Sequence, residues 1–362
     1  PYNASEAGGM EYPTFFTAEN STYYEPGTIS EYMIDFVTIH EFGHGYFMGI
    51  LGSNEFEEPM LDEGMNEYWD QRMLSDRGQK IWPVTPFLRW LGVRPAINPF
   101  VFERLAGVVG INYPADSLGA NSWDRMSNFS YGSVYSRTAS TMRTIENLWG
   151  QEEMGKAMKL YYDRWKFRHP TAADLRDALA EGTGEPELIH SIFESQVYGT
   201  QKVDASVVSV DNHEQVPRTG TFIKDGKRVT LTKDEVEKQI KDARKKWNEE
   251  HKDAKHGGPY PWHSVVTVRR TGAAVPRTVR VNFADDTSAT VNWVDDSRWK
   301  RFSFDRPVKA VSAEIDPDNK VLLDAKILNN SHAVKADNSA ARRYGSDWSD
   351  LLRTVYTFLG TL

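Results

Sequence analysis

The chain has 362 residues, a net charge of −8 and 40% hydrophobic residues, which is typical of a soluble globular protein with two or three domains. The acidic balance, together with the lack of a basic patch with interleaved aromatic residues, argues against a nucleic-acid partner. Because the sequence contains no cysteine, a thiolate metal site, a disulfide and a cysteine nucleophile are all excluded. The cellular compartment stays open, since a cysteine-free chain suits reducing and oxidising surroundings alike.

The first 29 residues include a glycine-rich motif, Gly8-Gly9-Met10-Glu11-Tyr12. Taken alone, this motif is typical of a turn that leads into a strand. The sequence contains neither a signal peptide nor a membrane-spanning run, so membrane association is not indicated within this chain. It also lacks an initiator methionine. We therefore expect a fragment or processed product whose targeting information lies upstream of Pro1. The compartment expected for the protein is the cytoplasm or the cell envelope.

Residues 30–48 are predicted to form one helix, with Ser30 as its N-cap and Gly49 as its stop. This helix carries the sequence H-E-F-G-H. His40 and His44 stand one turn apart on the same face, so their imidazoles can bind one metal ion. Glu41 points to the side of that ion and can reach a water bound to it.

A second helix is predicted to follow Pro59 and to run toward Gly78. It carries Glu63, which eighteen intervening residues separate from His44 and which suits a third metal ligand. Glu67 lies one turn further on and can accept the free ring N–H of a ligand histidine, for which we favour His40. The alternative is that both glutamates form a solvated pair on a helix surface.

Taken together, H-E-x-x-H, eighteen residues and E-G-x-x-E-Y resemble the zinc signature of the M1 (aminopeptidase N-like) gluzincins. The resemblance implies a mainly helical, thermolysin-like catalytic domain that binds one zinc ion per chain.

The glycine-rich motif is similar to the G-x-M-E-N exopeptidase motif of the same family. By this resemblance Glu11 binds the free α-amine of a peptide substrate, while Gly8, Gly9 and Met10 line the cleft. Tyr12 stands where the family usually has asparagine, which puts side-chain hydrogen bonding to the substrate carbonyl in doubt.

Residues 130–138 resemble the stretch that carries the family's catalytic tyrosine. Tyr135, with Arg137 two residues later, is the best match, and Tyr131 is the competitor. A phenol at this place can donate a hydrogen bond to the oxyanion of a tetrahedral intermediate.

The hydrophobic pattern predicts an α+β multidomain fold. Helical spacing returns after Ser133 and persists to about Tyr198, and from about residue 200 the period changes toward that of strands. We expect a catalytic domain over residues 1–200, truncated at its N-terminal side, and a small antiparallel β-sandwich over residues 201–330. The pairs Asp285-Asp286 and Asp295-Asp296 are interpreted as turns rather than calcium ligands.

Two further helices are predicted in the second half of the chain. A capping box at Thr232 and Glu235 begins a charged helix over residues 232–252, inserted in the sandwich. Residues 331–362 are expected to form a linker and a C-terminal amphipathic helix, too short to span a bilayer.

The leading hypothesis is a zinc aminopeptidase in which Glu41 is the general base, Tyr135 stabilises the oxyanion and Glu11 holds the N-terminus of a peptide substrate. An N-terminal domain or segment outside the chain is expected to complete the cleft. Two alternatives stay open: an endopeptidase or bifunctional hydrolase, and a non-catalytic binding module with a peptidase-like fold.

Overall fold

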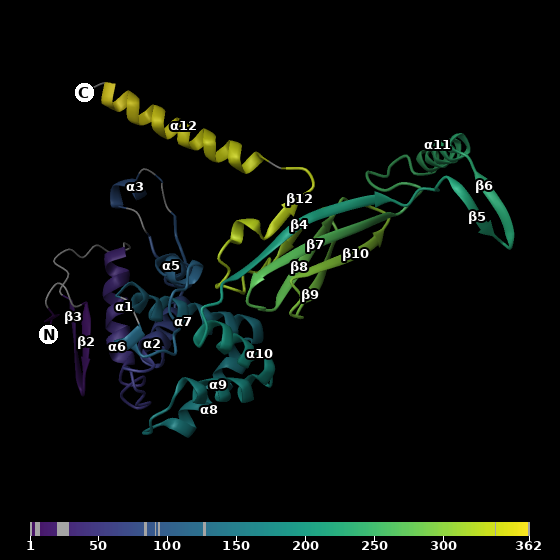
Figure 1. Ribbon diagram of the computed structural model, residues 1–362. Coiled ribbons are helices and arrows are strands. Elements are labelled where there is room, and N and C mark those ends of the chain that lie inside the picture. The colour runs from purple at the N-terminus through teal and green to yellow at the C-terminus, as the bar shows by residue number, and fades with distance from the viewer. Residues whose placement is uncertain are drawn as a thin grey trace.

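The computed structural model combines a helical half with a half made of antiparallel sheets. A long C-terminal helix extends from the sheets back toward the helical half (Figure 1). The structure describes residues 2–3, 8–19, 29–82, 85–90, 92, 95–125, 128–336 and 338–360.

A small sheet of three strands comes before the first helix. Its strands are β1 (Tyr2–Asn3), β2 (Gly9–Tyr12) and β3 (Phe15–Glu19), in the order β1-β3-β2. β2 pairs antiparallel with β3 and lies at the edge of this sheet. The glycine-rich motif therefore does lead into a strand, as the sequence predicts.

The first helix, α1 (Ile29–Gly43), is shorter than the expected helix over residues 30–48. It ends at Gly43, because the chain closes tight turns there: the N–H of Tyr46 donates to the carbonyl of Gly43 at 2.8 Å. Ser30 lies within its first turn instead of capping it. His44 keeps the helical spacing all the same, since its N–H donates to the carbonyl of His40 at 3.3 Å.

The rest of the helical half is built from short and long helices around a large apolar core, beside a smaller buried cluster of Tyr32, Leu74 and Ile81. Val134, Met142 and Ile145, predicted as a helical stripe, are completely buried in this core. The helices are η1 (Pro59–Leu61), α2 (Glu63–Asp76), α3 (Pro86–Trp90), α4 (Pro99–Ala106), α5 (Val108–Asn112), α6 (Ser122–Arg125), α7 (Asn128–Trp149), α8 (Gln151–Trp165), α9 (Ala172–Thr183), α10 (Pro186–Ile192) and the π-helical turn Phe193–Val197.

Two antiparallel sheets enclose a second core. Val279, Val281 and Phe283 alternate into it, as the period of two predicts. The sheet orders are β10-β7-β4 and β12-β11-β8-β9. The strands are β4 (Val203–Glu214), β7 (Trp262–Gly272), β8 (Arg277–Phe283), β9 (Ser288–Trp293), β10 (Trp299–Arg306), β11 (Ala310–Ile315) and β12 (Ser331–Ala333). The last strand extends the sheets slightly beyond the expected end at residue 330.

The capping box at Thr232 and Glu235 is confirmed, and it begins α11 (Lys233–Glu250). A hairpin that was not predicted from the sequence lies directly before this helix and is made of β5 (Gly220–Lys224) and β6 (Lys227–Leu231). At the other end of the chain, α12 (Ser339–Gly360) is the expected amphipathic helix. In the part of the chain that the structure describes, no helix has the length and apolar character needed to cross a membrane.

A close helix contact fixes the position of α2. Gly64 is buried against α7, and a Cβ atom placed on it would lie 2.5 Å from Cβ of Thr138 and 2.6 Å from the carbonyl oxygen of Val134. Only hydrogen fits at this point. Because Gly64 follows Glu63 directly, any shift of this contact also moves the carboxylate of Glu63.

We expect Gly64→Ala to lower the free energy of unfolding by about 1–3 kcal/mol, the usual cost of overpacking a core. Gly155→Ala on α8 is the matched control, since a Cβ atom there meets nothing within 4 Å. That control should leave the stability unchanged or raise it by about 0.5–1 kcal/mol, because alanine favours helices over glycine. Urea unfolding followed by circular dichroism measures both, and equal midpoints for the two variants would contradict the close contact.

Candidate active site

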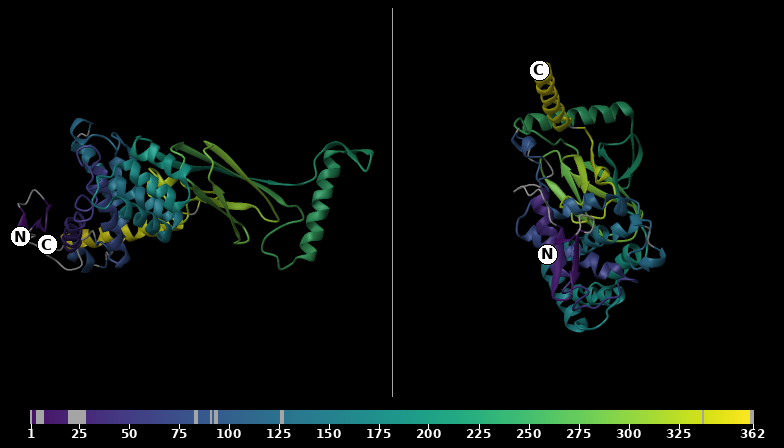
Figure 2. Two further views of the ribbon diagram at one scale, coloured as in Figure 1. Left: turned by 90° about the horizontal axis from the view of Figure 1, so that it is seen from below. Right: turned by 90° about the vertical axis from the view of Figure 1, so that its left-hand side faces the viewer.

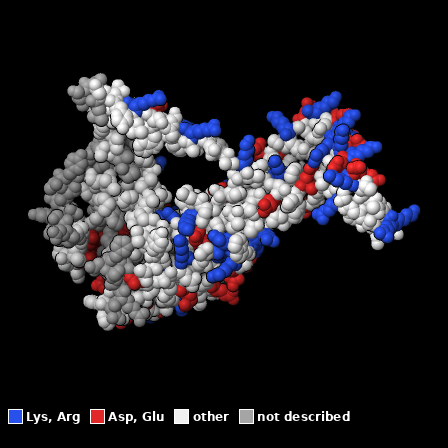
Figure 3. Space-filling model, turned by 45° about the horizontal axis from the view of Figure 1, so that its top comes forward, with Lys and Arg blue, Asp and Glu red and all other residues white. Residues whose placement is uncertain are grey.

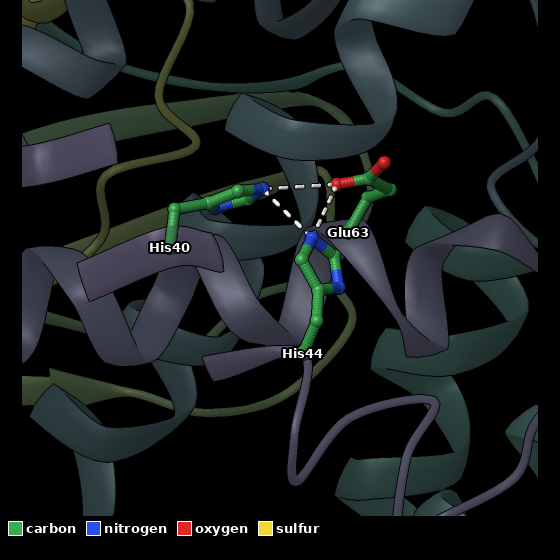
Figure 4. A group of neighbouring side chains, drawn as sticks. All are labelled: His40, His44 and Glu63. Atoms are coloured by element: carbon green, nitrogen blue, oxygen red, sulfur yellow. Dashed lines mark hydrogen bonds and ion pairs between the residues drawn. The ribbon is translucent and has the colours of Figure 1, made fainter. Parts of the chain in front are cut away.

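Three side chains from α1, the turn after it and α2 bring their ligand atoms to one point (Figure 4). Nε2 of His40 lies 3.1 Å from Oε2 of Glu63 and 3.2 Å from Nε2 of His44. Nε2 of His44 lies 3.5 Å from the same oxygen of Glu63. The spacing predicted from the sequence therefore does bring these three residues together.

This donor set fits a zinc ion. Zinc takes imidazole nitrogen and carboxylate oxygen at roughly 2.0–2.2 Å, and a tetrahedral site then places its ligand atoms about 3.3 Å apart. The three separations of 3.1, 3.2 and 3.5 Å bracket that value. Two histidines and one glutamate leave a fourth corner open, as a catalytic zinc requires.

The ring nitrogens that face away from this point are held by aspartates. Nδ1 of His44 lies 2.6 Å from Oδ1 of Asp62, and Nδ1 of His40 lies 2.7 Å from Oδ2 of Asp70. Each Nδ1–H can donate to its aspartate, which leaves both Nε2 atoms free to bind a metal.

The partner of His40 is therefore Asp70 and not Glu67, which corrects the sequence prediction. Oε2 of Glu67 is 3.7 Å from Nδ1 of His40, too long for a hydrogen bond. Its other oxygen accepts from Nε2 of Gln71 at 3.0 Å. The alternative of a solvated glutamate pair is also wrong for Glu67, which is 3% exposed.

The electrostatics of the site favour a bound cation. Burial by itself lowers the pKa of His40, but hydrogen bonds to Asp70 and Glu63 outweigh it and raise that pKa to about 10. Burial raises the pKa of Asp62 and of Asp70 to about 6, despite their histidine partners. Carboxylates buried this deeply need a neighbouring positive charge, which a proton on His40 or a divalent ion can supply.

Glu41 lies beside the three ligand residues and faces the edge strand β2. A Cβ atom on Gly9 would lie 2.0 Å from Oε1 of Glu41, so the backbone of β2 packs directly against this carboxylate. Burial raises the pKa of Glu41 to about 7. Oε2 of Glu41 is buried without a hydrogen-bond partner in the described structure. A carboxyl group with these properties is poised to accept and release a proton near neutral pH.

A cleft of about 910 Å³ opens onto this site. Glu11, Glu41 and His44 form its polar wall, and Tyr12, Phe15, Phe16, Phe42 and Met48 give it an apolar lining. An oxygen of Glu11 lies within 4.8 Å of a ring nitrogen of His44. The cleft is therefore large enough for a peptide end and carries an acidic group beside the metal position.

The neighbours of Glu11 in the glycine-rich motif differ in their placement. Gly9 contacts Glu41, as described above, and Gly8 precedes it with a positive φ of 61°. Gly8, Gly9 and Met10 are not among the residues that line the cleft, and Met10 is 41% exposed. The alternation of a strand explains the exposure of Met10, because Met10 points to the face opposite Gly9 and Glu11.

Tyr135, on α7, reaches the same site. Its ring centroid lies 6.0 Å from that of His40. Burial would raise the pKa of Glu63, but hydrogen bonds with His40 and with the Tyr135 hydroxyl hold that pKa below its usual value. The side chain of Tyr131 lies outside the described part of the structure. Arg137 points elsewhere: its guanidinium is buried and donates to the carbonyl of Gly199 at 3.2 Å.

Sequence reasoning missed three residues that support the ligands. Asp62 and Asp70 hold the two histidines, and Nδ2 of Asn66 donates to the backbone carbonyl of His40 at 2.7 Å. The signal for Asp70 was present in the sequence, because it lies seven residues after Glu63 and seven residues make almost two full helical turns.

The chain is similar to several known proteins. Residues 2–196 match the model of the peptidase family M1 domain. The chain is 26% identical to Aminopeptidase M1-A of Oryza sativa subsp. japonica over 165 residues, which are 45% of this chain and 18% of the rice protein. It is 25% identical to Aminopeptidase N of Lactobacillus delbrueckii subsp. lactis over 201 residues, 53% of this chain and 22% of that protein. The chain thus aligns with about a fifth of the length of these relatives.

Among solved structures, the chain is similar to Legionella pneumophila aminopeptidase A, crystallised in complex with aspartic acid. The TM-score is 0.50 at 11% identity, and the match covers 88% of this chain and 30% of that one. At this identity the likeness concerns the fold alone.

The contacts of the two histidines predict how zinc affinity responds to substitution. We expect Asp70→Asn to weaken zinc binding by about 10- to 100-fold, because it removes the charge that orients His40. Glu67→Gln is the matched control. Oε2 of Glu67 lies 3.7 Å from Nδ1 of His40, so glutamine of the same size removes no hydrogen bond to this histidine and should change the affinity by less than about threefold.

Competition with a chromophoric chelator measures both dissociation constants. If Glu67→Gln weakened zinc as much as Asp70→Asn, the assignment of Asp70 as the partner of His40 would fail.

Proposed function

The chain belongs to peptidase family M1, and we propose that it is a zinc-dependent aminopeptidase that removes the N-terminal residue of peptides with an activated water. One observation carries the proposal: three ligand atoms of His40, His44 and Glu63 converge within 3.5 Å of one another. They do so in a cleft that also contains Glu41 and Glu11. The activity, the substrates and the zinc mechanism of the whole protein are parts of this proposal.

Zinc held by His40, His44 and Glu63 would supply Lewis-acid polarisation of the scissile carbonyl and would lower the pKa of water. Two residues of the chain carry the other roles: one transfers the proton and the other stabilises the negative charge that develops on the substrate oxygen. Glu41, with a pKa near 7, takes a proton from the attacking water on its carboxylate and returns it to the leaving amine. The hydroxyl of Tyr135, which hydrogen-bonds to Glu63, would donate to the developing oxyanion.

Glu11 defines the exopeptidase character in this proposal. Its carboxylate lies at the cleft wall beside His44, where it can pair with the ammonium group of a peptide N-terminus. A buried ammonium needs such a partner, because otherwise its desolvation is not compensated. The substrate is then anchored one residue from the scissile bond, so a single residue is released in each cycle.

The division into domains is a further part of the proposal. We place a catalytic domain at residues 1–200, a β-sandwich at 201–330 and a linker with the C-terminal helix at 331–362. Two separate cores support the first boundary, since one core draws on residues between Phe47 and Val197 and the other on residues between Ala205 and Ile315.

We also propose that a segment outside these 362 residues completes the cleft. Two observations support this. The chain matches only 30% of the Legionella structure, and Phe42, which lines the cleft, is 60% exposed.

Replacing the general base tests the mechanism. We expect Glu41→Gln to lower kcat for alanine 4-nitroanilide by at least about 10²- to 10⁴-fold, because glutamine cannot take a proton, while the zinc content stays at one per chain. Glu57→Gln, at an exposed position after α1, is the matched control and should keep full activity. Turnover and zinc content are measured for both variants and for the unmodified protein, and a loss of turnover without a loss of zinc supports Glu41 as the general base. A complete parent protein, including the segment that completes the cleft, that holds stoichiometric zinc without any turnover would instead be a binding module.

Replacing the amine anchor tests the exopeptidase assignment. Glu11→Gln should lower kcat/KM for substrates with a free amine by roughly 30-fold or more, the usual effect of removing one partner of a desolvated ion pair. Peptides with an acetylated N-terminus should show no such difference between the variant and the unmodified protein. Equal losses on free and blocked peptides would contradict the role of Glu11, and preferred cleavage of blocked peptides would indicate an endopeptidase.

A further inference from the structure

Residues 215–261 form an arm that leaves the β-sandwich at one end. β4 and β7 pair with each other as far as Glu214 and Trp262, so the whole arm is an insertion between two adjacent, paired strands. It consists of the hairpin β5–β6 and the helix α11, and it projects away from the helical half (Figures 1 and 2). At its base, Nη2 of Arg244 on α11 forms an ion pair with Oε2 of Glu214 at 2.5 Å.

The hairpin has a regular register and two open edges. Asp225 and Gly226, both with positive φ, form its two-residue turn. In such a hairpin the flanking residues, here Lys224 and Lys227, form the closing hydrogen-bonded pair. Thr221 and Ile223 of β5 therefore direct their backbone N–H and C=O groups away from β6. Within the described chain this sheet contains two strands, and none pairs with the outer edge of β5.

The side chains of the hairpin are unusually apolar for a projecting element. Ile223 is 82% exposed, Phe222 is 42% exposed and Val229 is 37% exposed. Two-stranded hairpins are marginally stable in water and gain stability from a third strand or a covering element. An open edge with exposed apolar residues is also the usual template for the addition of another strand.

The charge of the arm is opposite to that of the rest of the chain. Residues 215–261 contain 12 lysines and arginines against 8 aspartates and glutamates, a net charge of +4, whereas the remaining residues carry −12. Lys224, Lys227 and Arg228 surround the tip of the hairpin. Figure 3 shows basic side chains gathered over the arm, with acidic ones between them. The arm therefore attracts an anionic partner.

Two other occupants fit less well. Pairing with the hairpin of a second copy would bring like charges together, which destabilises cross-strand pairs. Insertion into a lipid bilayer would bury unpaired backbone groups, which costs several kcal/mol for each group. An extended acidic peptide satisfies both the open edge and the positive charge.

We propose that the outer edge of β5 binds an acidic, extended peptide segment of a partner protein as a third strand. The backbone of that segment pairs with Thr221 and Ile223. Its carboxylates lie near Lys224, and its apolar side chains cover Ile223 on the opposite face. The arm thereby serves as a docking element, separate from the cleft.

The test uses a fluorescein-labelled peptide amide of the sequence Glu-Thr-Val-Glu-Val-Glu, whose N-terminus is blocked by the label and so is no aminopeptidase substrate. Fluorescence anisotropy should show saturable binding to the whole chain, and the affinity should fall several-fold between about 50 and 200 mM salt, because salt screens the charge contacts. The same peptide with methyl groups on alternate backbone nitrogens should bind at least tenfold more weakly, because it cannot complete the strand pairing.

Two proline variants locate the docking edge. Ile223→Pro removes an outward N–H and should raise Kd for the peptide at least tenfold, since the hydrogen bonds between β5 and β6 use other residues. Thr230→Pro makes the same change on the outer edge of β6 and should alter Kd less than about twofold. Lys224→Glu, which leaves the backbone intact, should weaken binding at least fivefold. Circular dichroism confirms that each variant is folded.

Three outcomes would overturn the proposal. Binding that survives both Ile223→Pro and backbone methylation would exclude strand addition. Sedimentation that shows a dimer disrupted by Ile223→Pro, without peptide binding, would identify a second copy as the occupant. Binding to phosphatidylserine vesicles but not to the peptide would identify a membrane surface.

Discussion

The site depends on four carboxylates buried beside two histidines. Asp62, Glu63, Glu67 and Asp70 lie within eight residues of one another, and all but Glu63 are almost fully buried. Burying this much negative charge is unfavourable unless a cation or protons neutralise it. Asp62 and Asp70, with pKa values of about 6, are mostly ionised at neutral pH. Without another cation, part of the compensating charge comes from protons held at His40, whose pKa is raised to about 10. A divalent ion would displace them, so metal binding and proton release are coupled here.

Close backbone contacts give this charged site its geometry. Gly64 lets α2 approach α7 closely enough to set Glu63, and Gly9 lets the edge strand lie against Glu41. Both contacts leave no room for a Cβ atom. The ligands and the candidate base are therefore fixed by elements that pack on opposite sides of α1 and α2, which is how a site gains precision from a rigid scaffold.

The sequence allowed the convergence of the two histidines to be predicted because helical spacing alone places His40 beside His44. It failed for the partner of His40. Four residues after Glu63 the helix has turned about 40° past a full turn, whereas seven residues leave it within about 20° of two turns. Asp70 therefore follows the direction of Glu63 more closely than Glu67 does.

The hairpin β5–β6 was missed for another reason: its charged residues concealed the Asp225-Gly226 turn, although Asp-Gly is a strong hairpin signal. The end of α1 at Gly43 depends on tight turns formed by the residues that follow Gly43. The spacing of hydrophobic residues along the sequence does not reveal such turns.

The β-sandwich supports the helices at one end and is free at the other. Nε of Arg104 on α4 donates to the carbonyl of Leu322 at 2.9 Å, and Oγ1 of Thr144 on α7 accepts from the N–H of Leu322 at 3.1 Å. The same helix α7 carries Tyr135, so the sandwich braces the element that presents this phenol to the site. The arm lies at the opposite end of the sandwich and shares none of these contacts (Figure 1). A partner bound to the arm would therefore tether the molecule without moving the cleft, because the contacts that transmit position to α7 come from the loop at residues 320–325 and not from β5 or β6.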